Sequence, residues 1–161
     1  MEVIDDGKAL KCECGVIGSD ANDLLKPYNR KIGPDPATLA TALVGGILNN
    51  NSSGMCCGTA QNSYKTIRSI RVVLLDGSIL DTSDQKSINQ FLKEKPQMVE
   101  DILQLRKDIL ADEELTHLIH HKYKIKNTTG YGLNSLVDFE DIIDIICLLY
   151  TSPSPRDSWA S

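Results

Sequence analysis

The sequence predicts an α+β fold, and three observations lead to that prediction. Two Asp-Gly pairs, at positions 6–7 and 76–77, each stand between segments rich in β-branched residues, which is typical of β-hairpins. Residues 83–121 instead carry the apolar spacing of helices. Between the two hairpins, residues 32–64 are rich in small residues and follow neither pattern. We therefore expect antiparallel strands, a helical insertion and an irregular segment.

The first hairpin is expected to pair residues 1–4 with residues 10–16. A short helix should follow, with Ser19 as its N-cap and Lys26 as its last residue. Pro27 ends it, because proline has no backbone N–H to continue the hydrogen-bond ladder.

The second hairpin is expected to pair residues 67–75, with the sequence IRSIRVVLL, with residues 78–81. We expect both hairpins to belong to one small α+β unit with an antiparallel or mixed sheet. The segment 83–121 should stand outside that sheet as an insertion.

The helical segment carries one apolar stripe, formed by Met98, Ile102, Leu105 and Ile109 at steps of four and three residues. This spacing places the four side chains on one face of a helix. It is the pattern of a helix that packs against a core, and we interpret it as packing rather than as a cofactor site.

A further helix is expected to begin at Asp112 and to end near His121. His117, His120 and His121 have helical spacing and share a face of it. A metal would need a further carboxylate or thiolate partner, so we predict a solvated helix end and no metal site.

Composition limits the classes of function. The chain has 161 residues and a formal net charge of −5, which argues against a partner that is nucleic acid. No apolar run reaches the roughly 20 residues that cross a bilayer. The N-terminus lacks the pattern of a secretory signal, and we interpret the five cysteines as reduced thiols. We expect a cytoplasmic protein, with the inner face of the membrane as its alternative location.

The C-terminal residues change composition abruptly. Residues 147–157, CLLYTSPSPRD, resemble the reading-frame translation of a widely used transposase sequencing adapter. We therefore expect residues 147–161 to be a non-native tail that packs poorly, and residues 1–146 to be the partial domain. A natural linker rich in proline and serine is the alternative.

The segment that points to chemistry is residues 32–64, IGPDPATLATALVGGILNNNSSGMCCGTAQNSY. Its glycines would let backbone approach a ligand closely, and its asparagines and serines offer uncharged hydrogen-bonding groups. Consecutive backbone N–H groups can bind an anion such as a pyrophosphate. Neither the P-loop nor the Rossmann fingerprint is present. On the residues alone, a structural turn rich in glycine remains an equal alternative.

Two motifs resemble a known family. They are GPDPAT with the following GGILNNNSSGMCCGTAQNSY, and the hairpin IRSIRVVLLDGSILDT. Both resemble flavoproteins of the vanillyl-alcohol oxidase type with a PCMH-type FAD-binding domain. Within them, the later HHKYKIKNTTGYGLNSLVDF is most similar to FAD-dependent D-lactate dehydrogenases that also carry an iron–sulfur domain.

The resemblance implies the cofactor FAD and places ten residues against it. These residues are Pro34, Ala42, Gly45, Gly46, Asn49, Asn50, Ser52, Ser53, Gly54 and Gly58. The family also has an upstream glycine-rich loop, a substrate domain and the cysteines of a 4Fe-4S cluster, which are not in this chain. We therefore expect a fragment that is truncated at both ends and inactive alone.

The implied reaction is the oxidation of a D-2-hydroxy acid, most simply D-lactate to pyruvate, with hydride transfer to FAD. D-2-hydroxyglutarate and glycolate are the alternatives in the same family. The implied partners are the hydroxy acid, a quinone or cytochrome that accepts electrons, and a membrane to which the parent protein binds peripherally. The sequence identifies no catalytic base. A hypothesis of another class is a non-catalytic interaction module that uses residues 83–121 as its surface.

Overall fold

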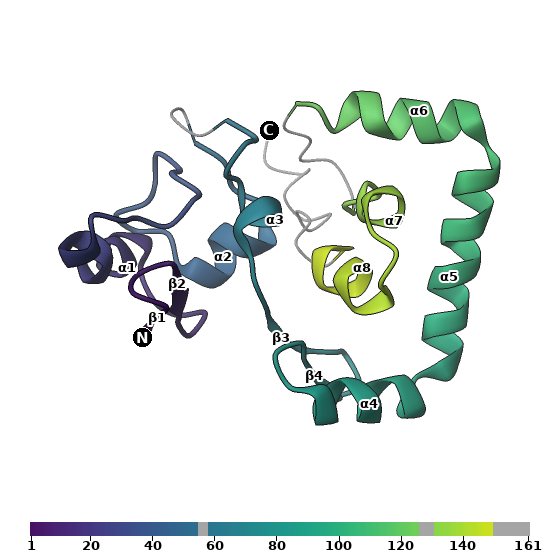
Figure 1. The fold of residues 1–161 in the computed structure, drawn as a ribbon, viewed down its shortest axis with the longest axis horizontal. Helices are drawn as coiled ribbons and strands as arrows, with labels where there is room; N and C mark the ends of the chain where they lie inside the picture. Colours follow the sequence, from purple (N-terminus) through teal and green to yellow (C-terminus); the bar gives the residue numbers. More distant parts are fainter. Residues whose placement is uncertain (55–57, 126–130, 150–161) are drawn as a thin grey trace. The chain divides into compact units, whose positions relative to one another are not determined.

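The computed structural model describes residues 1–54, 58–125 and 131–149 (Figure 1). These residues form two compact units, which are described separately. Of the described residues, unit 1 contains 1–54 and 58–68, and unit 2 contains 69–125 and 131–149. Helices and short antiparallel strands occur in both, consistent with the predicted α+β class.

Unit 1 contains one hairpin and several short helices. Its elements are β1 (Glu2–Ile4), β2 (Ala9–Lys11), α1 (Gly18–Leu25), the 3-10 helix η1 (Lys26–Tyr28), α2 (Val44–Asn49) and α3 (Ser63–Thr66). The strands β1 and β2 are antiparallel, with Val3 opposite Leu10, so the first predicted hairpin is confirmed.

The strand β2 is shorter than predicted, because the residues after Lys11 bond to a different partner. The carbonyls of Cys14 and Val16 accept the N–H groups of Gly45 and Val44, at 2.9 and 2.7 Å. These residues therefore anchor the start of α2 and do not extend the hairpin.

The helix α1 has the predicted length and a different beginning. Its N-cap is Ile17, which makes no side-chain capping bond. Ser19 lies inside the first turn, and its N–H donates to the carbonyl of Leu39 at 3.1 Å, so its predicted capping role is wrong. The helix ends at Leu25, and Pro27 lies in η1, where its missing N–H is not needed.

Unit 2 contains the second hairpin and five helices among its described residues. Its elements are β3 (Arg71–Val73), β4 (Ile79–Asp81), α4 (Gln85–Glu94), α5 (Pro96–Ala111), α6 (Glu113–Lys122), α7 (Ser135–Asp138) and α8 (Ile142–Leu149). The predicted pairing is confirmed, with Val72 opposite Leu80. Asp112 caps α6 by accepting the N–H of Leu115 at 2.9 Å, as the acidic start of this helix predicted.

One expectation about the sheet is wrong. The hairpins form separate two-stranded antiparallel sheets in different units and do not share one small unit. Residues 83–121 form helices and contribute no strand, and α4 packs against the second hairpin. Phe91 of α4 and Leu80 of β4 lie in one apolar cluster, because a two-stranded sheet has too little surface to bury Leu80 by itself.

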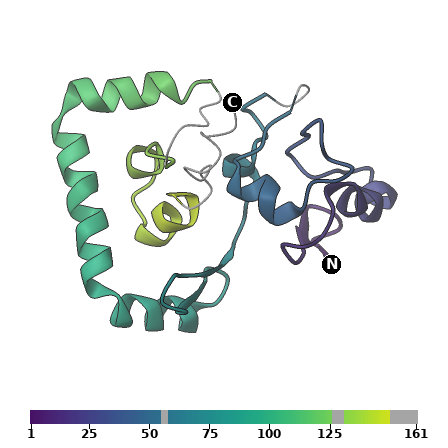
Figure 2. The same ribbon diagram turned by 180° about the vertical axis from the view of Figure 1, so that it is seen from behind.

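Helices α4, α5 and α6 surround α7 and α8 within unit 2, as both views show (Figures 1 and 2). The helix α8 contributes to two clusters through different faces. Ile143 and Ile146 join Leu80 and Phe91, whereas Ile145 packs in the second cluster. That second cluster consists of Ile109, Ile119, Leu136 and Ile145. Unit 2 is therefore organised around α8.

The predicted apolar stripe of α5 is confirmed at three of its four positions. Ile109 is buried, and Met98 and Ile102 are partly buried against the clusters. Leu105 is 46% exposed, because it lies at the edge of the packed face.

The first residues of the expected tail are packed, which corrects one expectation. The helix α8 continues to Leu149, and Cys147 and Leu148 are only 7% and 5% exposed. Both extend the apolar face of α8, and burial raises the pKa of Cys147 to about 11. Residues 150–161 lie outside the described residues, and a non-native origin of residues 147–161 stays a prediction.

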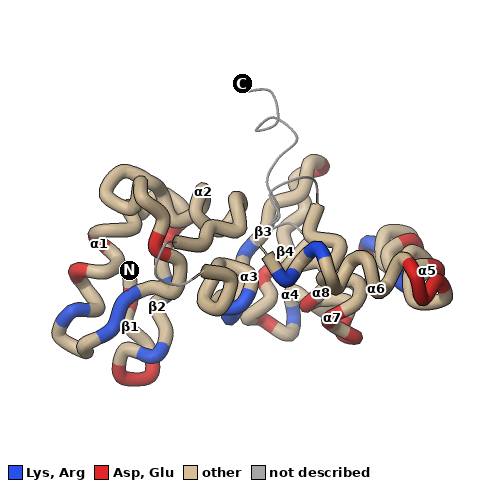
Figure 3. Tube along the Cα trace, turned by 90° about the horizontal axis from the view of Figure 1, so that it is seen from above, with Lys and Arg blue, Asp and Glu red and all other residues tan. Residues whose placement is uncertain are grey.

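Charged side chains of both signs are interspersed along each unit (Figure 3). In unit 1, Arg68 pairs with Asp5 at 2.6 Å, which ties the turn of the first hairpin to the residues after α3. No described helix has both the length and the apolar character needed to cross a membrane.

Candidate functional site

The candidate site is the segment around α2, where the neighbouring glycines Gly45 and Gly46 have different surroundings. A Cβ atom at Gly45 would lie 2.8 Å from the Cβ of Cys14, so this glycine is required by the fold. A Cβ at Gly46 would meet no protein atom within 4 Å, and this residue is exposed. Gly46 is therefore the position at which a ligand could approach the backbone of α2.

Both glycines lie inside a helix, which differs from the expectation of an irregular glycine loop. The reason is the anchoring of the first turn, since the N–H groups of Val44 and Gly45 bond to the segment 14–16. Those two amides are consequently used within the protein and do not face an anion.

Three other candidate residues face the interior of unit 1. Pro34 is buried, and a Cβ at Gly54 would lie 2.0 Å from the carbonyl oxygen of Asp35. Ser52 is 4% exposed, and its N–H donates to the carbonyl of Ile47 at 2.9 Å. These residues hold the backbone of the segment in place.

The remaining candidates are at least partly accessible. Gly46 and Asn49 are exposed on α2, and Asn50, at its C-cap, is partly buried. A spacing of three and four residues places Gly46, Asn49 and Asn50 on one face of the helix, here called the α2 face. Ala42 and Ser53 are partly buried, and Gly58 is exposed with a positive φ of 49°.

Two residues that hold α2 were not predicted from the sequence: Asn51, which follows the C-cap of α2, and Ser63, the first residue of α3. Asn51 has a positive φ of 40°, and its Oδ1 accepts the N–H of Tyr64 at 2.9 Å. Ser63 is fully buried, and its hydroxyl donates to the carbonyl of Ile47 at 2.9 Å. The signal for Asn51 was its place in the Asn-Asn-Asn run, since asparagine tolerates the left-handed conformation better than most residues.

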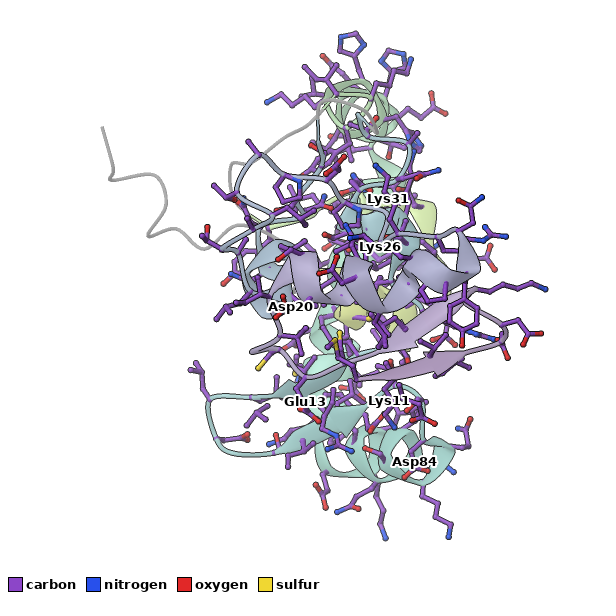
Figure 4. The ribbon with its side chains drawn as sticks, turned by 90° about the vertical axis from the view of Figure 1, so that its left-hand side faces the viewer. Lys11, Glu13, Asp20, Lys26, Lys31 and Asp84 are labelled. Atoms are coloured by element: carbon purple, nitrogen blue, oxygen red, sulfur yellow. The ribbon has the colours of Figure 1, made fainter. Side chains whose placement is uncertain are left out.

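Two lysines of unit 1 are paired with carboxylates. Lys26, near the C-terminal end of α1, pairs with Asp23 at 2.6 Å, and Lys31 pairs with Asp35 at 3.0 Å (Figure 4). Burial raises the pKa of the Cys12 thiol, so this cysteine stays protonated at neutral pH. The hydrogen-bonding groups on the face itself are the amides of asparagine and of the backbone.

The predicted histidine face at the end of α6 is solvated. His117, His120 and His121 are exposed, and the Nδ1 of His120 is 3.9 Å from a carboxylate oxygen of Asp138. Within the described residues, no group of three or more His, Cys, Asp or Glu side chains could hold a metal ion.

Comparison with known proteins identifies the family. The family described as "FAD binding domain" matches residues 1–83, which is more than half of the 161-residue chain. The chain therefore belongs to the FAD-binding domain family. The match contains all of unit 1 together with β3 and β4, and it ends before α4.

Curated relatives match about half of the chain. A protein of Escherichia coli (strain K12) named D-2-hydroxyglutarate dehydrogenase is 34% identical over 82 residues, which are 51% of this chain and 8% of that protein. A protein of Haemophilus influenzae with the same name is 30% identical over 80 residues, or 50% of this chain and 8% of the relative. The match thus spans about one twelfth of each relative. No solved structure matches the chain.

The hydrogen-bonding groups of the α2 face are of the kind that can bind a flavin nucleotide. Gly46 leaves open space beside the backbone, and Asn49 and Asn50 supply neutral amides next to it. A dinucleotide needs such close backbone approach and many uncharged hydrogen bonds along its sugar and phosphate groups. The chemistry of Gly46, Asn49 and Asn50 therefore suits such a ligand.

Proposed function

We propose that this chain is the FAD-binding part of a flavoprotein dehydrogenase that oxidises a D-2-hydroxy acid to the 2-keto acid. The family match over residues 1–83 supports the cofactor, and the names of the curated relatives support the substrate class. FAD, when bound, supplies the hydride acceptor. The single observation that carries the proposal is the open position at Gly46, next to Gly45, where a Cβ atom would lie against Cys14.

The residues of the chain would bind and orient the cofactor. Gly46 would let the backbone approach FAD, while Asn49 and Asn50 would donate or accept hydrogen bonds. Gly45 and Ser52 would hold α2 from its inner side. No described residue is proposed as a catalytic base.

The first candidate substrate is D-2-hydroxyglutarate, because three curated relatives that match about half of the chain carry the name D-2-hydroxyglutarate dehydrogenase. D-lactate is the second candidate, supported by the resemblance of the motifs in residues 33–82 and of the later stretch around NTTGYG. An iron–sulfur cluster, a quinone or cytochrome as electron acceptor, and a cytoplasmic location near the membrane complete the proposal for the whole protein.

The test is a substitution at the open position. Gly46→Val in the whole protein adds side-chain atoms where FAD would lie, and its Cβ would meet no atom within 4 Å outside the helix and the neighbouring residues. We expect the flavin absorbance of the purified variant to fall sharply, while the midpoint of thermal unfolding of the apoprotein changes little. Ser53→Ala should have a smaller effect, since one hydrogen bond contributes about 0.5–1.5 kcal/mol net.

Normal flavin content and turnover in Gly46→Val would contradict the proposal. The substrate is tested separately, by reduction of an artificial electron acceptor with D-2-hydroxyglutarate or D-lactate as donor. Faster turnover of D-2-hydroxyglutarate at equal concentration is expected, and a preference for D-lactate would reverse the order of the candidates.

A further inference from the structure

We propose that Asn51 and Ser63 are positioning residues, which hold the α2 face in the geometry that binds FAD. The proposal rests on the proposed function, because it concerns the same cofactor. Neither residue lies on the α2 face itself. Each connects α2, or the residue just after it, to the segment that begins α3.

Asn51 acts at the point where the chain leaves α2. Its backbone adopts the left-handed conformation, with φ of 40°, and this reverses the chain so that the N–H of Ser52 returns to the carbonyl of Ile47. The side chain makes a second connection, because its Oδ1 accepts the N–H of Tyr64, 13 residues further along the chain. One residue thus determines both the end of the helix and its attachment to α3.

Ser63 makes the complementary connection from the side of α3. Its hydroxyl donates to the carbonyl of Ile47 at 2.9 Å, and its N–H donates to the carbonyl of Ser52 at 3.1 Å. The side chain is fully buried, so water does not compete for these bonds. Ser63 therefore bonds both to the helix and to the residue that follows its end.

These bonds matter because they hold the C-terminal end of α2, whereas the bonds of Val44 and Gly45 hold its first turn. The helix has six residues, and Ile47 is its only buried side chain. A helix of this length is not stable in isolation, and one buried isoleucine does not fix its rotation. Ile47 is the residue to which Ser52 and Ser63 bond, and it lies next to Gly46 in the chain. Loss of these bonds would let the α2 face rotate or fray, and a cofactor would then have to order it on binding.

The test compares two asparagines that share the left-handed conformation. Asn51→Gly keeps the backbone geometry accessible and removes the acceptor for Tyr64. Asn29→Gly is the matched control, because Asn29 has φ of 54° and ends η1, away from α2 in the chain. Both variants of the whole protein are titrated with FAD as apoprotein, and thermal unfolding of each apoprotein is measured.

We expect Asn51→Gly to weaken FAD binding about tenfold, the size of one lost hydrogen bond, and Asn29→Gly to leave it unchanged. The unfolding midpoints of the two apoproteins should be similar. Asn51→Asp retains the acceptor oxygen and should bind FAD close to wild type at high salt, where its added charge is screened. Ser63→Ala, which removes the hydroxyl alone, should weaken FAD binding in the same direction.

Three outcomes would overturn the proposal in distinguishable ways. Unchanged FAD affinity in both Asn51→Gly and Ser63→Ala would leave FAD binding in place and remove the positioning role. A loss of affinity matched by an equal loss in apoprotein stability, with no recovery in Asn51→Asp, would assign a structural role only. Absence of FAD binding by the wild-type protein would overturn the proposed function, and this proposal with it.

Discussion

The interior of unit 1 and the interior of unit 2 are stabilised by different kinds of interaction. In unit 2, two clusters of buried aliphatic and aromatic side chains surround α8. In unit 1, the buried apolar side chains are few, namely Ala21, Leu25, Ile47 and Tyr64, and much of the interior consists of backbone hydrogen bonds, buried serines and close glycine contacts. Hydrophobic burial stabilises without much dependence on direction, whereas hydrogen bonds and close contacts require defined geometry.

This difference indicates that unit 1 is better suited to binding a ligand and that unit 2 is organised for stability. A segment held by backbone bonds and glycines can expose its remaining polar groups, as α2 exposes Gly46 and Asn49. A segment that buries aliphatic side chains on several sides, such as α8, has no comparable free face. The family match agrees with this division, since it covers unit 1 completely and ends before the helices that form most of unit 2.

The largest expected effect is the loss of an aromatic side chain from unit 2. Phe91 is 2% exposed, and Phe91→Ala should lower the free energy of unfolding by about 3–5 kcal/mol because it leaves a cavity beside Leu80. Val73→Ala is the control, since Val73 is 66% exposed and should change stability little. Urea unfolding measures both. Equal effects of the two substitutions would show that unit 2 does not depend on its clusters.

A single added methyl group should distinguish the closely packed glycine Gly54 from the open glycine Gly46 in unit 1. Gly54→Ala would place a Cβ against the backbone of Asp35, and we expect a loss of about 1–3 kcal/mol in the free energy of unfolding. Gly46→Ala adds the same group in open space inside a helix, and should stabilise by up to about 1 kcal/mol. If both substitutions change the free energy of unfolding in the same direction, the assignment of Gly54 to the inner side and of Gly46 to the outer side is wrong.

Removal of a helix cap should change the stability by a smaller amount, and only in unit 2. Asp112 caps α6 through its side chain, so Asp112→Ala should cost about 1 kcal/mol. Ser19 makes no capping bond in α1, and Ser19→Ala should stay within about 0.5 kcal/mol of wild type. Thermal unfolding of the two variants compares them. A larger loss of stability in Ser19→Ala than in Asp112→Ala would support the capping role that the sequence predicted for Ser19.

The smallest effect is expected at the exposed turn of the second hairpin. Hydrogen bonds from Lys95 and Ser78 hold the pKa of Asp76 well below the usual range of an aspartate. Because the pKa is lowered in the folded state, the contribution of this carboxylate to stability is fully present above about pH 4, and it is lost as the pH falls from there through the lowered pKa. Asp76→Asn removes the contribution, so the urea midpoints of variant and wild type should differ at pH 7, and the difference should shrink steadily as the pH falls below about 4. A difference that stays constant below about pH 4 would exclude this carboxylate as the cause.

Local signals in the sequence predicted the elements well and their assembly poorly. The Asp-Gly turns predicted both hairpins, and the apolar spacing predicted the helices of residues 83–121, because these patterns act over a few residues. Whether the hairpins share a sheet depends on contacts between distant residues, which no local pattern contains. The packing of Phe91 against Leu80, and the burial of Cys147 and Leu148, likewise depend on contacts that a local pattern does not contain.

The sequence by itself determined the chemical character of the candidate site. Residues 32–64 could be recognised as neutral, rich in glycine and suited to a nucleotide, because these properties belong to the residue types. Only the tertiary structure separated the outward Gly46 from the inward Gly45 and Gly54, and only it identified Asn51 and Ser63. The physical reason is that a glycine or asparagine has the same composition on either face of a chain. Its role depends on which atoms the fold brings to within a few ångströms of it.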